Sequence, residues 1–276
     1  MTIPLPVKPV AILGLLALPL AGCEVLDGLE GRAPSVNLDR AAVAHVAAAA
    51  RDSGEYATAA GVYEKYLAAH PTDVAAQVDF GDAALQAGEM DKASEIFAKA
   101  LEHGPGQTGA HMGLGRIYLA KHKPHQALAE FQAVIATDPK NLRALNGAGI
   151  ALDMLGRSHV AQQSYRATLA IKSDDRAARN NLGLSLALSG AYDQAIAELS
   201  KLTLEPGATA RMRQNLALAL GLKGDDAGMA RVAHTDLDDA AVVENQRFFA
   251  TVRRLGNPSP GASGVAPAAT DKRTGS

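Results

Sequence analysis

The side chains best suited to chemistry in this sequence are histidines and aspartates in two short groups. His122 and His125 stand three residues apart, with His111 nearby, and imidazole nitrogens are common metal ligands. Pro124 lies between the pair and places it in a turn, and no cysteine or carboxylate stands beside it at ligand spacing. We therefore expect a solvated turn here and no bound metal.

The second group, Asp236, Asp238 and Asp239, could hold a divalent cation, but helix capping explains it more simply. Aspartate accepts hydrogen bonds from the free N–H groups at a helix start, where its charge also suits the helix dipole. The sequence contains no nucleophile elbow, Walker A loop, dinucleotide-binding glycine pattern or H-E-x-x-H motif. We therefore expect no enzyme activity, no cofactor and no small-molecule substrate.

The only cysteine, Cys23, follows an apolar stretch near the amino terminus. Lys8 precedes this stretch, and its ten residues, 11–20, are too few for a helix that crosses a bilayer, which needs about 20. The ending Leu20-Ala21-Gly22-Cys23 resembles the bacterial lipobox. The resemblance implies a lipoprotein signal peptide at 1–22 and a diacylglycerol (palmitate-type chains) on Cys23. The alternative is a plain cleavable signal that leaves an unpaired thiol.

Lipidation of Cys23 would tether the protein to a membrane of the cell envelope, facing the periplasm. Several acyl chains anchor stably, since each buried methylene contributes about 0.8 kcal/mol. The next residue, Glu24, is not the aspartate that resembles an inner-membrane retention signal, which favours the outer membrane. Residues 23–38 are interpreted as a lipidated tether. The Gly-, Pro-, Ser- and Ala-rich segment 256–276 is expected to be disordered, with a role as a contact tail left open.

The elements that would position the remaining side chains follow from a period of 34 residues. Proline recurs at Pro71, Pro105 and Pro139, and small residues recur in two series, Gly81, Gly115, Gly149, Gly183 and Ala59, Ala93, Ala127, Ala161, Ala195. Turn glycines recur at Gly54, Gly88, Gly156, Gly190 and Gly224. Large side chains follow each alanine by four residues, at Tyr63, Phe97, Phe131, Tyr165 and Leu199.

A 34-residue period with these offsets resembles the tetratricopeptide repeat, a helix–turn–helix unit that stacks into a solenoid. The resemblance predicts an all-α tetratricopeptide-repeat α-solenoid over 39–255, with about six units and a C-terminal capping helix from Asp238-Asp239 to about Leu255. Small residues would let paired helices approach closely while the large side chain fills the space between units. His122 replaces the turn glycine in one unit, and Ser173 replaces the proline in another.

In tetratricopeptide arrays the first helix of each unit lines a concave groove that binds protein partners. Carried onto this chain, the resemblance gives a mixed groove of apolar, amide and charged residues: Val78, Asp82, Leu85, Met112, Arg116, Leu119, Arg143, Asn146, Ile150, Met154, Asn180, Leu184, Leu188, Arg211, Gln214 and Leu218. Side-chain amides such as Asn146 and Asn180, one period apart, can bond a peptide backbone. Many of the apolar members would serve packing alone. The lysines of the chaperone-binding carboxylate clamp are absent.

Nucleic acid is an unsuitable partner, because 27 basic residues are balanced by 29 acidic ones and no basic surface is indicated. The segments RNNLGLSLALSGAYDQAIAELSKL (179–202) and GATARMRQNLALALGLKGD (207–225) resemble TadD-type lipoproteins of the tight-adherence (Flp) pilus system, as do Asp236-Leu237, Asn245 and Phe248-Phe249. The resemblance implies a role in pilus assembly and secretion, helping an outer-membrane secretin to be localised or assembled. A general envelope adaptor, for peptidoglycan enzymes or outer-membrane protein insertion, is the alternative. A periplasmic enzyme or metal-binding protein is more remote.

Overall fold

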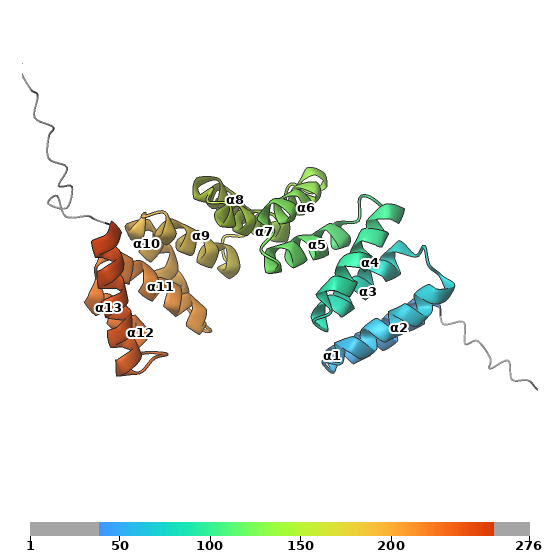
Figure 1. Ribbon diagram of the computed structural model, residues 1–276, viewed down its shortest axis with the longest axis horizontal. Helices are drawn as coiled ribbons and strands as arrows, with labels where there is room; N and C mark the ends of the chain where they lie inside the picture. Colours follow the sequence, from blue (N-terminus) through green and yellow to red (C-terminus); the bar gives the residue numbers. More distant parts are fainter. Residues whose placement is uncertain (1–38, 257–276) are drawn as a thin grey trace, which may run out of the picture. The chain divides into compact units, whose positions relative to one another are not determined.

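The computed structural model describes residues 39–256, which form thirteen helices and no strand (Figure 1). The helices are α1 (Arg40–Asp52), α2 (Tyr56–Ala69), α3 (Val74–Gln86), α4 (Met90–His103), α5 (Thr108–Ala120), α6 (Pro124–Thr137), α7 (Leu142–Met154), α8 (Ser158–Ile171), α9 (Arg176–Leu188), α10 (Tyr192–Thr203), α11 (Ala210–Lys223), α12 (Asp226–Ala233) and α13 (Asp239–Gly256). The predicted all-α solenoid of six helix pairs and a terminal helix is confirmed. Within 39–256 no helix combines the length and apolar character needed to cross a bilayer.

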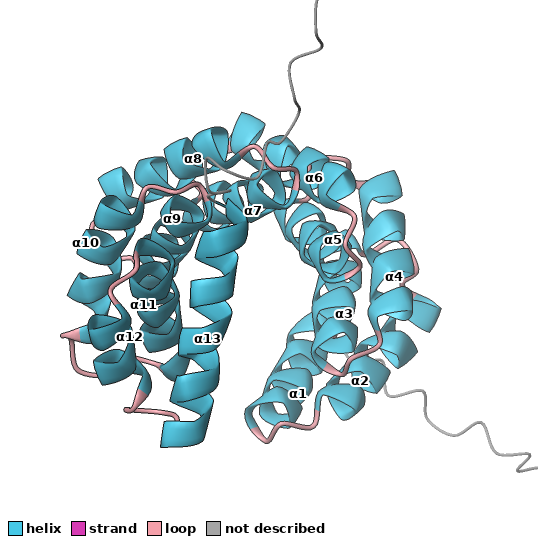
Figure 2. Ribbon diagram, turned by 60° about the vertical axis from the view of Figure 1, so that its left-hand side comes forward, coloured by secondary structure: helices cyan, strands magenta, loops and turns pink. Residues whose placement is uncertain are grey.

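The helices form two layers. Each helix packs against the one before and the one after it, and from α3 to α13 each odd-numbered helix also contacts the next odd-numbered one. Figure 2 shows the odd-numbered helices on the inner side of the array and the even-numbered helices α2 to α10 outside them. The side chains of the odd-numbered helices therefore make up the inner face.

The turns between paired helices need a left-handed backbone. Gly54, Gly88, Gly156, Gly190 and Gly224 adopt φ values of 77°, 84°, 72°, 86° and 98°, as glycine does at low cost. His122, which replaces the glycine in one unit, keeps the same conformation with φ 53°. The turn is therefore preserved at this position, at the expense of placing a side chain in the left-handed region.

Glycines of the inner helices give the large side chains their space. A methyl group added at Gly81 would stand 2.5 Å from the Phe97 ring, and one at Gly113, in the next unit, would overlap the same ring. Phe131 lies similarly close to Gly115 and Gly147. Phe97 and Phe131 are almost fully buried. The predicted role of the large side chain, between one unit and the next, is confirmed.

The last unit departs from the repeat. Met229 stands where earlier units have alanine and is fully buried, and α12 is only eight residues long. Asp238 Oδ1 accepts a hydrogen bond from Ala241 N–H at 2.9 Å, so Asp238 caps α13. Phe249 of α13 is buried against Gly221, where an added methyl group would overlap the ring. Its neighbour in the chain, Phe248, is 58% exposed.

Candidate functional site

The predicted groove residues lie on α3, α5, α7, α9 and α11, and most are at least partly accessible. The exposed members are Arg116, Arg143, Met154, Leu188, Arg211 and Gln214. The half-buried members are Val78, Asp82, Leu85, Met112, Leu119, Asn146, Ile150, Leu184 and Leu218. Asn180 differs, since only 6% of it is exposed. The remaining predicted site residue, Cys23, lies outside the described residues.

Four asparagines form a chain of hydrogen bonds across the inner layer. Asn215 Nδ2 of α11 donates to Asn180 Oδ1 at 2.9 Å, and Asn180 Nδ2 donates to Asn181 Oδ1 at 3.4 Å. Asn181 Nδ2 of α9 then donates to Asn146 Oδ1 of α7 at 3.1 Å. The Asn180 amide, expected to be available to a peptide, is buried and already bonded within the array through its oxygen and its nitrogen. Asn181 and Asn215 were missed, although their spacing of one period was a signal.

A polar hollow of about 580 Å³ lies between α3, α5 and α7. Arg116 and Arg143 stand on its wall together with Asp82, and Gly109 and Gly113 belong to its lining. One guanidinium nitrogen of Arg116 lies 3.8 Å from Asp82 Oδ1. Burial raises the pKa of the Asp82 carboxyl, and the nearby Arg116 offsets part of that effect. The hollow thus combines two guanidiniums with one partly shielded carboxylate.

The starts of the inner helices are capped differently from one another. The side chains of Asp73, Asn141, Asp175 and Thr209 accept a hydrogen bond from the first turns of α3, α7, α9 and α11. Gln107, at the corresponding place before α5, makes no such bond. Thr108 and Gly109, in the first turn of α5, line the hollow. The side chain before α5 therefore leaves the N–H groups of this turn uncapped.

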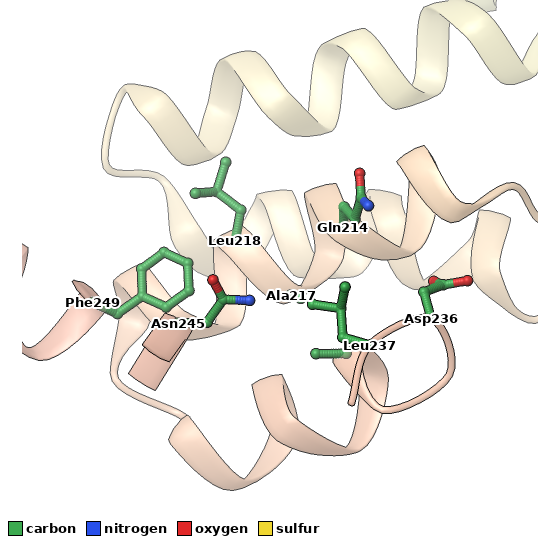
Figure 3. A pocket seen from close by; sticks show the side chains of 8 residues that line it. Gln214, Ala217, Leu218, Asp236, Leu237, Asn245 and Phe249 are labelled. Carbon is green, nitrogen blue, oxygen red and sulfur yellow. The ribbon is translucent and has the colours of Figure 1, made fainter. Parts of the chain in front are cut away.

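A second, more apolar hollow of about 330 Å³ lies between α11, α13 and the turn that joins α12 to α13. Figure 3 shows Leu218 and Gln214 from α11, Leu237 and Asp236 from the turn, and Asn245 and Phe249 from α13 around it. Helix α12 has eight residues where α8 has 14, so less helix is available to fill this end of the unit. None of the turn or α13 residues was predicted for the groove.

The carboxylate at the edge of this hollow is held by a fixed partner. Arg213 Nε donates to Asp236 Oδ2 at 2.7 Å, and a second guanidinium nitrogen donates to Asp236 Oδ1 at 2.5 Å. These hydrogen bonds hold the pKa of Asp236 below its usual range. Both carboxylate oxygens of Asp236 therefore accept hydrogen bonds from Arg213, which argues against the cation site considered from sequence.

A cluster of three polar side chains near the core serves structure. Tyr165 O–H donates to Asp153 Oδ2 at 3.0 Å, and Ser185 Oγ donates to Asp153 Oδ1 at 2.7 Å. Burial, followed by the charge of Asp153, raises the pKa of Tyr165 far above its usual value. The three residues join α7, α8 and α9. Both carboxylate oxygens of Asp153 are thus used by hydroxyls of neighbouring helices within the fold.

The histidines do not assemble into a metal site in the part of the chain that the structure describes, where no three potential ligands are grouped. His111 instead faces Glu130 Oε2 through Nδ1 at 2.7 Å and the Pro105 carbonyl through Nε2 at 2.9 Å. His122 and His125 are exposed. His111 thus links α5 to α6 and to the loop that precedes α5.

Comparison with known proteins agrees with the architecture. The sequence matches the tetratricopeptide repeat over residues 50–117 and 91–149, and again over 155–211. Together these matches cover more than half of the chain. It belongs to the tetratricopeptide-repeat family. Tetratricopeptide repeats generally bind protein partners and act as scaffolds for protein–protein interaction.

Several solved structures share the fold. A tetratricopeptide-repeat protein from Parabacteroides merdae ATCC 43184 superposes with a TM-score of 0.61 at 17% identity, covering 79% of this chain and 87% of that one. YrrB, described as having an unusual peptide-binding site, superposes with a TM-score of 0.55 at 20% identity, covering 67% of this chain and 97% of that one. TTC0263 from Thermus thermophilus superposes with a TM-score of 0.54 at 22% identity, covering 64% of this chain and 97% of that one. These likenesses establish the fold alone. No protein with a curated description matches the sequence.

Proposed function

We propose that this tetratricopeptide-repeat protein is a non-catalytic scaffold, tethered to a membrane on its periplasmic side, that binds partners along its inner face. The observation that carries the proposal is the composition of that face. Leu188 of α9 and Met154 of α7 are 64% and 40% exposed, and the polar hollow at α3–α7 and the apolar hollow at α11–α13 are lined by residues of the same inner layer. A partner that covered these side chains would gain about 25 cal/mol for each Å² of apolar surface removed from water.

Substitution on the two layers tests this surface. Leu188→Glu places a charge on the inner face, whereas Val160→Glu places one on the outer helix α8, where Val160 is 45% exposed. Both variants should remain folded, because both positions are open to solvent. Partner capture by the purified protein should fall with Leu188→Glu and stay unchanged with Val160→Glu. Equal capture by both variants and the unmodified protein would place the binding surface elsewhere.

The proposed setting is assembly of a tight-adherence (Flp) pilus, with an outer-membrane secretin as the partner. The support is the resemblance of 179–202 and 207–225 to TadD-type lipoproteins. These segments form α9, α10 and α11, and the matching residues Asn245 and Phe249 line the hollow beside α11. The resemblance is therefore concentrated at the C-terminal end of the array, where a partner-specific surface would be expected.

A deletion strain tests the pilus setting. Loss of the protein should reduce secretin multimers and pilus display, and the unmodified gene should restore both. Genes for a secretin, a pilin and a secretion ATPase beside this one would support the assignment. Normal secretin multimers and pili in the deletion strain would refute it. Capture of peptidoglycan enzymes or of the outer-membrane insertion machinery would favour a general envelope adaptor instead.

The proposed anchor rests on Cys23 and the preceding Leu20-Ala21-Gly22. Cys23→Ala should abolish incorporation of labelled palmitate and release the protein from the outer-membrane fraction into the soluble periplasm. Cys23→Ser is the closer control for size and should behave in the same way. Retention of either variant in the outer membrane would contradict anchoring through this residue.

A further inference from the structure

The polar hollow between α3, α5 and α7 carries a charge pattern that the fold does not require. Arg116 and Arg143 stand on its wall, and both are exposed. At 3.8 Å, the closest approach of Arg116 to Asp82 is too long for a hydrogen bond. Within residues 39–256, Arg143 forms no ion pair with a carboxylate. Two guanidiniums with free donors therefore face a hollow that contains one carboxylate.

Two glycines in the lining of the hollow let α5 pack closely on its neighbours. Gly109 packs on Val78, where an added methyl group would stand 2.5 Å from the valine side chain, and Gly113 packs on Phe97. These close contacts fix α5 against its neighbours at the hollow. Arg116 and Arg143 also line the hollow, and both side chains are exposed.

The charges identify the chemistry of the occupant. Guanidinium groups bind carboxylates through paired, charge-assisted hydrogen bonds, and Asp82 makes no hydrogen bond to either guanidinium, so their donors are open to a ligand carboxylate. A polyanion such as nucleic acid would need a wider basic surface, and this chain has a formal net charge of -2. The hollow is lined by the inner-layer helices α3, α5 and α7, and α7 also carries the exposed Met154.

We infer that this hollow receives the carboxylate of an aspartate or glutamate side chain from a partner segment that lies along the inner face. The inference deepens the proposed partner-binding role and rests on it, but it does not depend on the pilus assignment. Arg143 holds the ligand carboxylate, and Arg116 contributes a second set of donors from the neighbouring helix. The groove position that holds Asp82 and Arg116 holds Ile150 and Leu184 in the next two units, so the segment carries apolar residues beside its acidic ones.

The repeat supplies a matched control. Arg211 stands two periods after Arg143, at the same position of its unit, and is likewise exposed, but it does not line this hollow. Arg143→Gln and Arg211→Gln therefore remove the same charge from equivalent places. Both should leave the helical circular dichroism and the unfolding midpoint unchanged, because neither residue is packed in the core.

Fluorescence anisotropy with the purified full-length chain tests the inference. The probe is the acetylated and amidated peptide Ala-Ala-Leu-Glu-Glu-Glu-Leu-Ala-Ala, and its counterpart has Gln in place of each Glu. The acidic peptide should bind saturably and lose about tenfold or more in affinity with Arg143→Gln, while Arg211→Gln has little effect. Equal binding of the two peptides, or equal losses in the two variants, would overturn the inference.

A third probe separates the source of the carboxylate. The Gln peptide with a free carboxyl terminus carries only a terminal carboxylate, and it should bind no better than its amidated form. Preferential binding of this peptide would overturn the side-chain assignment in favour of a chain terminus. Failure of the proposed partner-binding role can be distinguished from failure of the carboxylate site. If the partner-binding role is wrong, the unmodified protein captures no envelope partner. If only the carboxylate site is wrong, the unmodified protein and Arg143→Gln would capture the partner equally well.

Discussion

Nδ1 of His111 lies 2.7 Å from Oε2 of Glu130, in the register that Arg179 and Glu198 occupy two repeats further along. Nε2 of His111 also faces the Pro105 carbonyl at 2.9 Å, and Arg179 likewise donates to both its glutamate and a loop carbonyl. A ring protonated at both nitrogens would donate to both acceptors at once. Histidine and arginine thus perform the same structural task in different units.

His111→Ala should lower the stability of the array by about 1–3 kcal/mol, because Glu130 and the loop carbonyl lose a partly buried donor. His111→Arg should retain most of the stability, since Arg179 already makes these contacts in its own unit. Urea unfolding followed by circular dichroism measures both. The interpretation fails if the alanine and arginine variants unfold at the same urea concentration.

A second prediction concerns His122, which adopts φ 53° where other units have glycine. The left-handed conformation costs a residue with a side chain about 1–2 kcal/mol, and glycine gives back part of this through the freedom of the unfolded chain. His122→Gly should therefore raise the free energy of unfolding by up to about 1 kcal/mol. Thermal unfolding would record this as a higher midpoint.

The opposite exchange provides the control. Gly156 adopts φ 72° with no atom within 4 Å of an added methyl group, so Gly156→Ala changes backbone preference without a clash. It should lower the midpoint by a similar amount. A lower midpoint for His122→Gly would mean that the imidazole makes a stabilising contact that outweighs its backbone cost.

The array was predictable from the sequence because the residues that form its turns and close helix contacts are local and recur. The left-handed turn glycines, and the glycines beneath Phe97, recur at fixed spacing and need no knowledge of distant contacts. The burial of Asn180 was not predictable in this way, because it depends on a hydrogen bond to Asn215 in the next unit. The polar hollow was likewise not predictable, because side chains from α3, α5 and α7 line it together. Where side chains of neighbouring units compete for one space, periodicity does not decide the outcome.

The asparagine chain yields a prediction that separates stability from binding. Asn180 is buried and bonded on both sides, so Asn180→Ala should cost about 1–3 kcal/mol by leaving Asn215 Nδ2 without its acceptor. Asn146 is half-buried and uses only its oxygen within the array among the bonds described for 39–256. Asn146→Ala should therefore reduce capture of a partner while changing the unfolding midpoint less.

Both variants are best compared under conditions in which each is folded, with capture of the envelope partner and urea unfolding measured side by side. Asn180→Ala should still capture the partner under conditions in which this less stable variant is folded. If instead Asn180→Ala abolishes capture and Asn146→Ala does not, the roles assigned to the two amides would have to be exchanged.

The ion pair between Arg213 and Asp236 makes the C-terminal end of the array sensitive to acid. The hydrogen bonds from Arg213 hold the pKa of Asp236 below its usual range in the folded protein. A lowered folded-state pKa stabilises the fold above the unfolded-state pKa, and this stabilisation disappears as the pH falls through the folded-state pKa. The contribution should therefore be complete at neutral pH and decline below about pH 4, the ordinary range of aspartate.

Arg213→Gln should accordingly lower the urea midpoint at neutral pH, and its difference from the unmodified protein should shrink as the solution is acidified. Arg231→Gln is the matched control, because Arg231 is exposed on α12 and forms no ion pair within the described residues 39–256. Its difference from the unmodified protein should be small at every pH. Since Asp236 borders the apolar hollow beside α11, the same acidification should loosen that hollow. A constant difference for Arg213→Gln across the acid range would show that the guanidinium acts through packing rather than through the carboxylate.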